Sequence, residues 1–282
     1  MKNTILFDSG STKTDIRIIC NRQITELQCA GINPFYQNGD EIYHALRNCF
    51  GQDENLEEFN IFFYGAGCSF EEKKEIVRSA LSHLFPKSCI IIENDLLGAA
   101  RALFQRKNGI ACILGTGANS CLYQGGEIIK NVPPLGYILG DEGSGANIGK
   151  LLVADILKGI APQEVILRFY EEEKCSCEEI MNRIYKGSFP NRYLATFSKH
   201  IYRHIDELYF QNLILEAFDN FFKRNIVQYD PTVKEIGFVG SIALHFAPQL
   251  EITAQKYGYS IQQILKSPIE ALITYHTASS RE

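Results

Sequence analysis

Two glycine-containing turns carry the strongest chemical signal in this sequence. The first, Asp8-Ser9-Gly10-Ser11-Thr12-Lys13, follows one apolar segment and precedes another. The second, Gly115-Thr116-Gly117, lies between apolar segments in the same way. A strand that turns back through small residues presents several backbone N–H groups with little side chain in the way, which suits a phosphate group. A chain with two such turns could hold one polyphosphate from both sides.

Three aspartates accompany these turns. Asp8 directly precedes the first turn, where a carboxylate would repel a phosphate unless Mg²⁺ lay between them; the alternative is a carboxylate that hydrogen-bonds its own turn. Asp95 stands where a buried strand gives way to a helix and can present its carboxylate to a cleft; the alternative is a helix N-cap, a role that Asn94 could serve equally well. Asp141 precedes a glycine-rich turn, and its alternative is a loop carboxylate without special function.

The apolar pattern predicts the elements that must position these residues. Strands are expected at residues 5–7, 15–20, 24–29, 60–64 and 88–93, in a hairpin over 110–122, and finally at 235–239. Helices are expected at 41–50, 70–85, 95–105 and 145–158, in a long region of about 163–227 broken near 187–191, and from 268 to the end. The first three strands would form an antiparallel meander, and the strands that alternate with helices imply a mostly parallel remainder.

Length and composition are those of an ordinary globular protein with two domains. The 282 residues exceed one typical domain, and 45% of them are hydrophobic against 22% charged, which excludes a disordered chain. Lys and Arg number 28 and Asp and Glu 33, so no surface built for nucleic acid or anionic lipid is expected. We expect a first domain over 1–107, a second with helical insertions over 108–266, and a terminal helix, about 267–282, that packs back on the first.

The sequence also indicates where the protein resides. The first residues lack the pattern of a secretion signal, and no apolar run is long enough to predict a membrane span. Nine cysteines, an odd number without paired zinc-ligand spacing, indicate free thiols in a reducing cytoplasm. Cys175 and Cys177 lie in an acidic segment, which favours a solvated helix or loop over a metal site.

Four motifs, in order and spacing, resemble the actin/Hsp70/sugar-kinase superfamily, and within it the N-acetylglucosamine kinase branch grouped with the BadF/BadG/BcrA/BcrD-type ATPases. The segment from Asp8 to Thr14 resembles the first phosphate motif, and the segment from Leu114 to Ser120 resembles the second. The segment from Gly140 to Ser144 resembles a signature loop of this branch, and the segment from Gly237 to Ser241 the adenosine motif. The resemblance runs from residue 4 to about residue 275.

The resemblance implies an α/β fold of two duplicated ribonuclease H-like domains of the actin-like ATPase type, with ATP held in an interdomain cleft. Asp8 would bind Mg²⁺ directly or through water, Asp95 would be the catalytic base, and Asn33, Asp95 and Asp141 would hold the sugar hydroxyls. The residues implied in binding ATP are Ser9, Gly10, Ser11, Thr12, Lys13, Gly115, Thr116, Gly117, Gly240 and Ser241.

The implied activity is the transfer of phosphate from ATP to the 6-hydroxyl of an amino sugar, with N-acetylglucosamine as the first candidate. Glucosamine, glucose and N-acetylmannosamine are the other acceptors to consider. The alternative is a BadF/BadG-type ATPase that drives a conformational change in a partner enzyme; those relatives hold an iron–sulfur cluster through a cysteine motif that the segment around Cys112 does not match. A third class is a module that binds nucleotide or sugar without turnover. A homodimer is the default expectation for the assembly.

Overall fold

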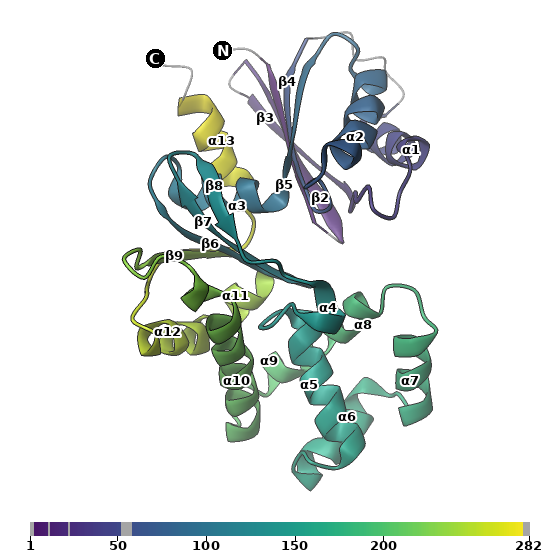
Figure 1. Ribbon diagram of the computed structural model, residues 1–282. Coiled ribbons are helices and arrows are strands. Elements are labelled where there is room, and N and C mark those ends of the chain that lie inside the picture. The colour runs from purple at the N-terminus through teal and green to yellow at the C-terminus, as the bar shows by residue number, and fades with distance from the viewer. Residues whose placement is uncertain (1–2, 11, 22, 52–57, 279–282) are drawn as a thin grey trace. The chain divides into compact units, whose positions relative to one another are not determined.

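The computed structural model describes residues 3–10, 12–21, 23–51 and 58–278. The chain divides into two compact units. The first contains the described residues up to Arg106 together with those from Ser267 onward, and the second runs from Lys107 to Lys266. Each unit has one five-stranded mixed sheet covered by helices (Figure 1).

The sheet of the first unit begins with the expected antiparallel meander. It consists of β1 (Thr4–Ser9), β2 (Lys13–Cys20) and β3 (Gln23–Ala30). The strands β4 (Asn60–Gly65) and β5 (Cys89–Asn94) extend it in parallel from β1, giving the order β3-β2-β1-β4-β5. The meander and the parallel remainder predicted from the sequence are both confirmed.

Helices cover both faces of this sheet (Figure 1). They are α1 (Gly39–Phe50), α2 (Glu71–Leu84), α3 (Asp95–Phe104) and α13 (Ile269–Ala278). The helices α1 and α2 pack together over the core formed by alternate strand residues such as Ile5, Phe7 and Phe63. The helices α3 and α13 pack together against β1 on the other face, because the intervening side chains of a strand point the opposite way.

The second sheet repeats the topology of the first. Its antiparallel strands are β6 (Gly109–Leu114), β7 (Ala118–Gln124) and β8 (Glu127–Asn131), and β9 (Glu235–Val239) and β10 (Ser260–Leu265) continue it in parallel from β6. The expectation that 235–239 is the final strand is wrong, because β10 follows it. β10 is an edge strand whose burial is only partial and whose apolar run is interrupted by Gln262 and Gln263, so its sequence signal is weak.

Most of the second unit outside the sheet is helical. The helices are α4 (Gly136–Leu139), α5 (Gly145–Lys158), α6 (Gln163–Glu173), α7 (Cys177–Tyr185), α8 (Pro190–Thr196), α9 (Ser198–Arg203), α10 (Leu208–Arg224), α11 (Ser241–His245) and α12 (Ala247–Lys256), with a 3₁₀ turn, η1, at Ile226–Gln228. The helix predicted at 145–158 is confirmed, and the region 163–227 is helical with several breaks. The apolar pattern does not predict α4, α12 or β8.

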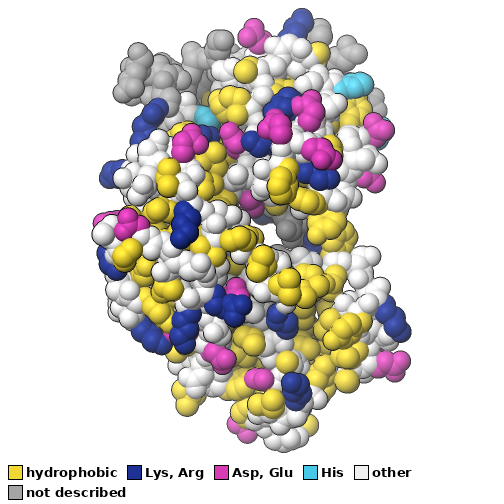
Figure 2. Space-filling view, in the orientation of Figure 1, with side chains coloured by type: hydrophobic (Ala, Val, Ile, Leu, Met, Phe, Trp, Pro, Cys, Tyr) yellow, Lys and Arg dark blue, Asp and Glu magenta, His cyan; other side chains and the backbone are white. Residues whose placement is uncertain are grey.

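The helix lengths and the surface charges of the described residues concern contacts with membranes and with charged partners. None of the helices in the described part of the chain combines the length and apolar character that crossing a bilayer requires. On the face shown in Figure 2, Lys and Arg side chains are interspersed with Asp and Glu and form no continuous basic surface. All nine cysteines are free thiols.

The packing of α5 against α8 depends on the absence of a side chain at Gly149. A Cβ atom there would lie 1.9 Å from the carbonyl oxygen of Leu194. We predict that Gly149→Ala lowers the free energy of unfolding by about 1–3 kcal/mol, the usual cost of overpacking, although alanine is the better helix former. Urea unfolding of the purified variant measures the change.

Gly39→Ala is the matched control. Gly39 is also a helical glycine, but its Cβ would meet only the carbonyl oxygen of Ile76 at 3.9 Å, an ordinary contact. This variant should be as stable as the parent or more so. Equal stability of the two variants would contradict the packing argument.

Candidate active site

Asp8 is a partly buried carboxyl group close to the end of β1. Among the described residues its hydrogen-bond partner is Ser267, whose hydroxyl donates to Oδ2 at 3.0 Å, and not a group of its own turn. The pKa of Asp8 is raised to about 7, chiefly by burial and in smaller part by the negative charges of Asp15 and Asp95, while the hydrogen bond from Ser267 and the charge of Lys13 lower it. Added positive charge, such as a bound divalent cation would supply, favours the ionised form of this group.

The hydroxyl group of Ser9 forms hydrogen bonds within the first unit. Ser9 is fully buried, and its Oγ lies 2.7 Å from the hydroxyl of Thr14 and hydrogen-bonds both the carbonyl, at 3.0 Å, and the N–H, at 2.9 Å, of Ile32. The side chain of Ser9 therefore anchors the segment that carries Asn33. Any contact of Ser9 with a phosphate would have to come from its backbone.

The turn that follows is closed by one backbone hydrogen bond. The N–H of Gly10 donates to the carbonyl of Lys13 at 3.0 Å, which sets the tight reversal between β1 and β2. The half-exposed ammonium of Lys13 lies 2.6 Å from a carboxylate oxygen of Asp15. Thr12 is exposed at the tip, and Ser11 lies outside the described residues.

The side chain of Asn33 is held in a tight local turn. Oδ1 of Asn33 accepts a hydrogen bond from the backbone N–H of Phe35 at 3.0 Å, and the backbone N–H of Asn33 donates to Oε1 of Gln37 at 2.7 Å. A Cβ atom on Gly67 would lie 2.3 Å from Asn33 Oδ1, and Gly67 has a φ of +83°. The loop after β4 therefore needs glycine at this position to pass beside Asn33.

Asp95 is the first residue of α3 and is not its N-cap. The N-cap is Asn94, whose Oδ1 accepts from the N–H of Leu97 at 2.8 Å. The carboxylate of Asp95 accepts from the N–H of Leu96 at 2.9 Å, and burial raises its pKa to about 6 against the opposing effect of that hydrogen bond. Because Asn94 caps the helix, the carboxylate of Asp95 is not needed as the N-cap and can take part in a reaction.

Cys68 connects the Asn33 loop with Asp95. The pKa of the Cys68 thiol is raised to about 12, chiefly by burial and in smaller part by the nearby charge of Asp95. Cys68 follows Gly67, which touches Asn33, so the three predicted residues Asp8, Asn33 and Asp95 lie around one end of the sheet in the first unit. Sequence reasoning missed Gln37 and Cys68, because no local pattern marks either residue.

The second glycine turn is bonded to the start of α5. The N–H of Gly115 donates to the carbonyl of Gly117 at 3.0 Å. The carbonyls of Gly115 and Thr116 accept from the N–H groups of Gly145 at 2.8 Å and Ala146 at 3.0 Å. Two of the N–H groups that a helix leaves without an intrahelical partner are used in this way, and the shape of the turn is set by them.

Asp141 and Gly240 meet this turn from two other parts of the second unit. A Cβ atom on Gly117 would lie 3.1 Å from Oδ2 of Asp141, a residue with 9% of its surface exposed and a φ of 55°. Burial raises the pKa of Asp141 to about 6, although a hydrogen bond from the backbone of Ala118 lowers it. A Cβ atom on Gly240, where φ is 126°, would lie 2.3 Å from the carbonyl oxygen of Leu114, so this close approach requires glycine.

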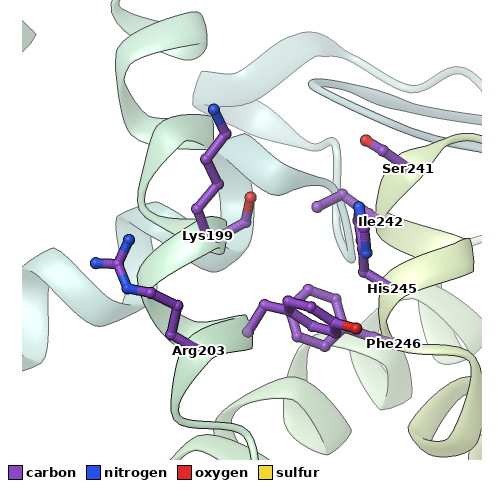
Figure 3. Close-up of a pocket in the computed structure, with 8 residues that line it drawn as sticks. Lys199, Arg203, Ser241, Ile242, His245 and Phe246 are labelled. Atoms are coloured by element: carbon purple, nitrogen blue, oxygen red, sulfur yellow. The ribbon is translucent and has the colours of Figure 1, made fainter.

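A cavity of about 290 Å³ opens beside Ser241 in the same unit. Lys199 and Arg203 border it from α9, and Ser241 and His245 border it from α11 (Figure 3). The ring of Tyr202, also in the wall, lies 4.8 Å from that of His245. Sequence reasoning found Ser241 but missed the α9 residues, since helical periodicity does not reveal which exposed side chains border a cavity.

Of the predicted residues, Asp8, Ser9, Gly10, Asn33 and Asp95 come together in the first unit, and Gly115, Thr116, Gly117, Asp141, Gly240 and Ser241 come together in the second. Cys112, the residue considered for an iron–sulfur cluster, is fully buried in β6, and burial raises its pKa well above the ordinary value. A cluster ligand is a thiolate, so this environment disfavours that role.

Comparisons with known proteins support one class of activity. No protein-family model matches the sequence. An N-acetylmuramic acid/N-acetylglucosamine kinase of Clostridium acetobutylicum is 26% identical over 216 residues, which are 71% of this chain and 69% of that protein. The crystal structure of a candidate N-acetylglucosamine kinase from Porphyromonas gingivalis is 41% identical, with a TM-score of 0.92, and the match covers 98% of this chain and 99% of that one.

The fold is shared more widely. MreB 5 of Spiroplasma citri, solved bound to AMPPNP, is 10% identical with a TM-score of 0.60, and the match covers 100% of this chain and 98% of that one. Together with the two sheets of equal topology, this likeness confirms the expected α/β fold of the actin-like type.

The buried carboxyl of Asp95 makes a testable contribution to stability. Its pKa is about 6 in the folded protein against an ordinary value of 3.8, so the folded state binds its proton more tightly than the unfolded state. The native protein therefore loses stability through this group as pH rises from about 4 to above 6. We predict that Asp95→Asn, measured by urea unfolding, is more stable relative to the parent at pH 8 than at pH 4, by about 1–3 kcal/mol.

Asp40→Asn is the control, because it removes an exposed carboxyl group from the first turn of α1. This variant should show no relative gain at high pH. A gain for Asp95→Asn that does not change with pH would contradict the assignment of a raised pKa.

Proposed function

Because the chain belongs to the N-acetylglucosamine kinase family, we propose that it transfers the γ-phosphoryl group of ATP to the 6-hydroxyl of N-acetylglucosamine. The observation that carries the proposal is the partly buried carboxylate of Asp95, which is held at the start of α3 and is not needed for helix capping because Asn94 is the cap. Asn33 and Asp8 lie in the same unit and supply the two further functions that the reaction needs, sugar binding and charge neutralisation.

Asp95 is assigned as the general base. Phosphoryl transfer requires little covalent work from the protein, so alignment and charge stabilisation account for most of the catalysis. The attacking sugar hydroxyl must nevertheless lose its proton, and a carboxylate within hydrogen-bond reach can accept it. A pKa raised by burial to about 6 suits this role, because a base is most effective when its pKa lies near the working pH.

Asp8 is assigned to Mg²⁺, either directly or through a water molecule. The fit rests on charge: Asp8, Asp15 and Asp95 gather negative charge, and burial holds the pKa of Asp8 at about 7. Carboxylate oxygens are the ligands that Mg²⁺ prefers. When bound, the ion would neutralise charge on the transferring phosphates. The hydroxyl of Ser267, which donates to Asp8, orients this carboxylate.

We assign the phosphates to the two glycine turns, with Gly10, Thr12 and Lys13 in one and Gly115 to Gly117 in the other. The N–H groups of Gly10 and Gly115 close their own turns, so the donors to phosphate would be the other backbone N–H groups of these turns. Ser11 shares this assignment by its place in the first turn. The nucleoside is assigned to the cavity beside Gly240 and Ser241, where the small residues leave room and the ring of Tyr202 offers a stacking surface.

The acceptor is assigned to Asn33 and Asp141. Oδ1 of Asn33 holds the N–H of Phe35, so the amide NH₂ group is the part that can donate to a sugar hydroxyl. The buried carboxylate of Asp141 can accept hydrogen bonds from hydroxyl groups. The relative from Clostridium acetobutylicum is named for two amino sugars, so N-acetylmuramic acid joins N-acetylglucosamine among the acceptors to test.

The nine free thiols are compatible with a reducing cytoplasm, which we propose as the location of the protein. A homodimer remains the default expectation for its assembly.

A coupled assay of ADP release across a panel of amino sugars, with and without Mg²⁺, tests the proposed reaction. We expect release that depends on N-acetylglucosamine and on Mg²⁺. Release without any sugar would favour the ATPase alternative, and no release would favour a module that only binds. In the same assay Asp95→Asn should lower kcat by about 10²–10⁴-fold, the usual contribution of a general base.

ATP binding by Asp95→Asn, measured by calorimetry, serves as the control, because the base does not hold the nucleotide. The variant should bind ATP as the parent does. Turnover close to that of the parent would remove Asp95 from the role of base.

The nucleoside assignment predicts a separate effect at Tyr202. Base–aromatic stacking contributes about 1–3 kcal/mol, so Tyr202→Ala should raise KM for ATP by about fivefold or more and leave KM for the sugar unchanged. Tyr185→Ala is the matched control, because Tyr185 is 76% exposed and is not among the residues of the cavity wall. A change in the sugar KM alone would contradict this placement of the nucleoside.

A further inference from the structure

A cluster in the second unit, apart from the candidate active site, has the composition of a metal site. Glu172 lies in the last turn of α6, His200 lies in α9, and His204 directly follows α9. One possible ligand atom from each residue lies within 4.8 Å of the other two. We propose that Glu172, His200 and His204 bind one Zn²⁺ ion, which joins α6 to α9.

The distances between the donor atoms suit a small tetrahedral ion. Oε1 of Glu172 lies 2.9 Å from Nε2 of His204, and Oε2 lies 3.3 Å from Nδ1 of His200. In a tetrahedron with bonds of about 2.0–2.1 Å, neighbouring ligand atoms are about 3.3 Å apart. Small shifts of these side chains are therefore enough to surround a zinc ion.

The ligand chemistry is also that of zinc. Imidazole nitrogens with one carboxylate are a common zinc donor set, and three protein ligands leave a fourth position for water. Calcium and magnesium prefer sites made of oxygen atoms alone, so two histidines disfavour them.

The surroundings hold both imidazole rings in place. His200 is fully buried, and its ring lies 5.3 Å from the ring of Phe169 and 5.8 Å from that of Phe210. The ring of His204 stacks on Phe210 at 5.9 Å, and its Nδ1 faces Oε1 of Glu207 at 3.7 Å. At that distance Glu207 does not hydrogen-bond the ring, and its Oε1 is paired with Nη2 of Arg168 at 2.7 Å, so the aromatic contacts are what position the two rings.

The alternative is that the same groups form only an ion-pair network with Arg203. Nη2 of Arg203 lies 3.0 Å from Glu172 and 2.8 Å from Glu173. The Arg203 side chain is 51% exposed, and ion pairs of this kind contribute little to stability. A metal ion would displace the guanidinium group from Glu172, and it would replace Glu173, now 3.1 Å away, as the partner of Nδ1 of His200; Glu173 keeps its contact with Arg203.

A metal site here would involve the helix that lines the cavity, without being part of the cavity. Lys199, Tyr202 and Arg203 of α9 line the cavity, and His200 of the same helix faces α6. Zinc would fix α9 to α6 beside Arg203, a residue of the cavity wall. The proposal does not rest on the kinase assignment, since it concerns metal binding by residues to which no role in transfer is assigned.

The test is a zinc titration of the full chain after treatment with a chelator, followed by competition with a chromophoric chelator. We expect one Zn²⁺ per chain, and Co²⁺ in its place should give the visible absorption of a tetrahedral site. His204→Gln and Glu172→Gln should each weaken binding by at least about 100-fold, since the loss even of an outer-shell partner costs about 10–100-fold.

His44→Gln is the matched control, because it removes an exposed histidine from α1 in the first unit, and it should bind zinc as the parent does. Thermal unfolding without zinc verifies that each variant is folded. Failure of the parent chain to bind one equivalent of Zn²⁺ would overturn the proposal whatever the variants do. Equal affinities of the parent and the two ligand variants would overturn it as well, since the ion would then be bound elsewhere.

Discussion

The parallel register of the central strands is the constraint on which the candidate site residues of each unit depend. In the first unit Ser9 pairs with Gly65 and Gly65 with Asn94, so the C-terminal ends of β1, β4 and β5 lie together at one end of the sheet. Asp8 and Asp95 are therefore brought to that end of the sheet although 87 positions separate them in the sequence. A shift of one residue in this register would turn each side chain to the opposite face of the sheet.

The second unit uses the same constraint for backbone groups. Ile113 of β6 pairs with Val239, the last residue of β9, and β6 ends one residue later at Leu114. The backbone of Gly240 then passes so close to the carbonyl of Leu114 that only glycine fits. The repeated topology thus places Asp8 and Asp95 at the strand ends of the first unit, and the close backbone approach of Gly240 to Leu114 at the strand ends of the second.

Burial of the carboxyl groups is the main energetic consequence of this arrangement. The pKa values of Asp8, Asp95 and Asp141 are all raised, in each case first by the loss of water. Three such groups lower the stability of the folded protein at neutral pH, because each must lose its proton without full access to water. Better solvated carboxylates would not have this cost. This is expected of an active site, where a cation and a hydroxylic substrate replace the missing water.

The sequence alone determined the features that depend on local chemistry. The small residues around Gly10 and Gly115 require tight turns, and the apolar alternation on either side predicts the strands that flank them. Asn94 followed by Asp95 predicts a helix start with two possible capping residues, and only the structure decided that Asn94 is the cap. The order of the motifs was sufficient to indicate the fold and the class of reaction.

The tertiary structure decided everything that depends on which distant residues meet. The buried network of Ser9, the contact of Gln37 and Gly67 with Asn33, the cavity wall on α9 and the histidine–glutamate cluster are formed by segments that carry no shared local pattern. The weak edge strand β10 belongs with them, because its place is set by pairing with β9 and not by its own apolar residues. The physical reason is that periodicity reports which side of an element faces the core, whereas the identity of the neighbour on that side is set only when the chain packs.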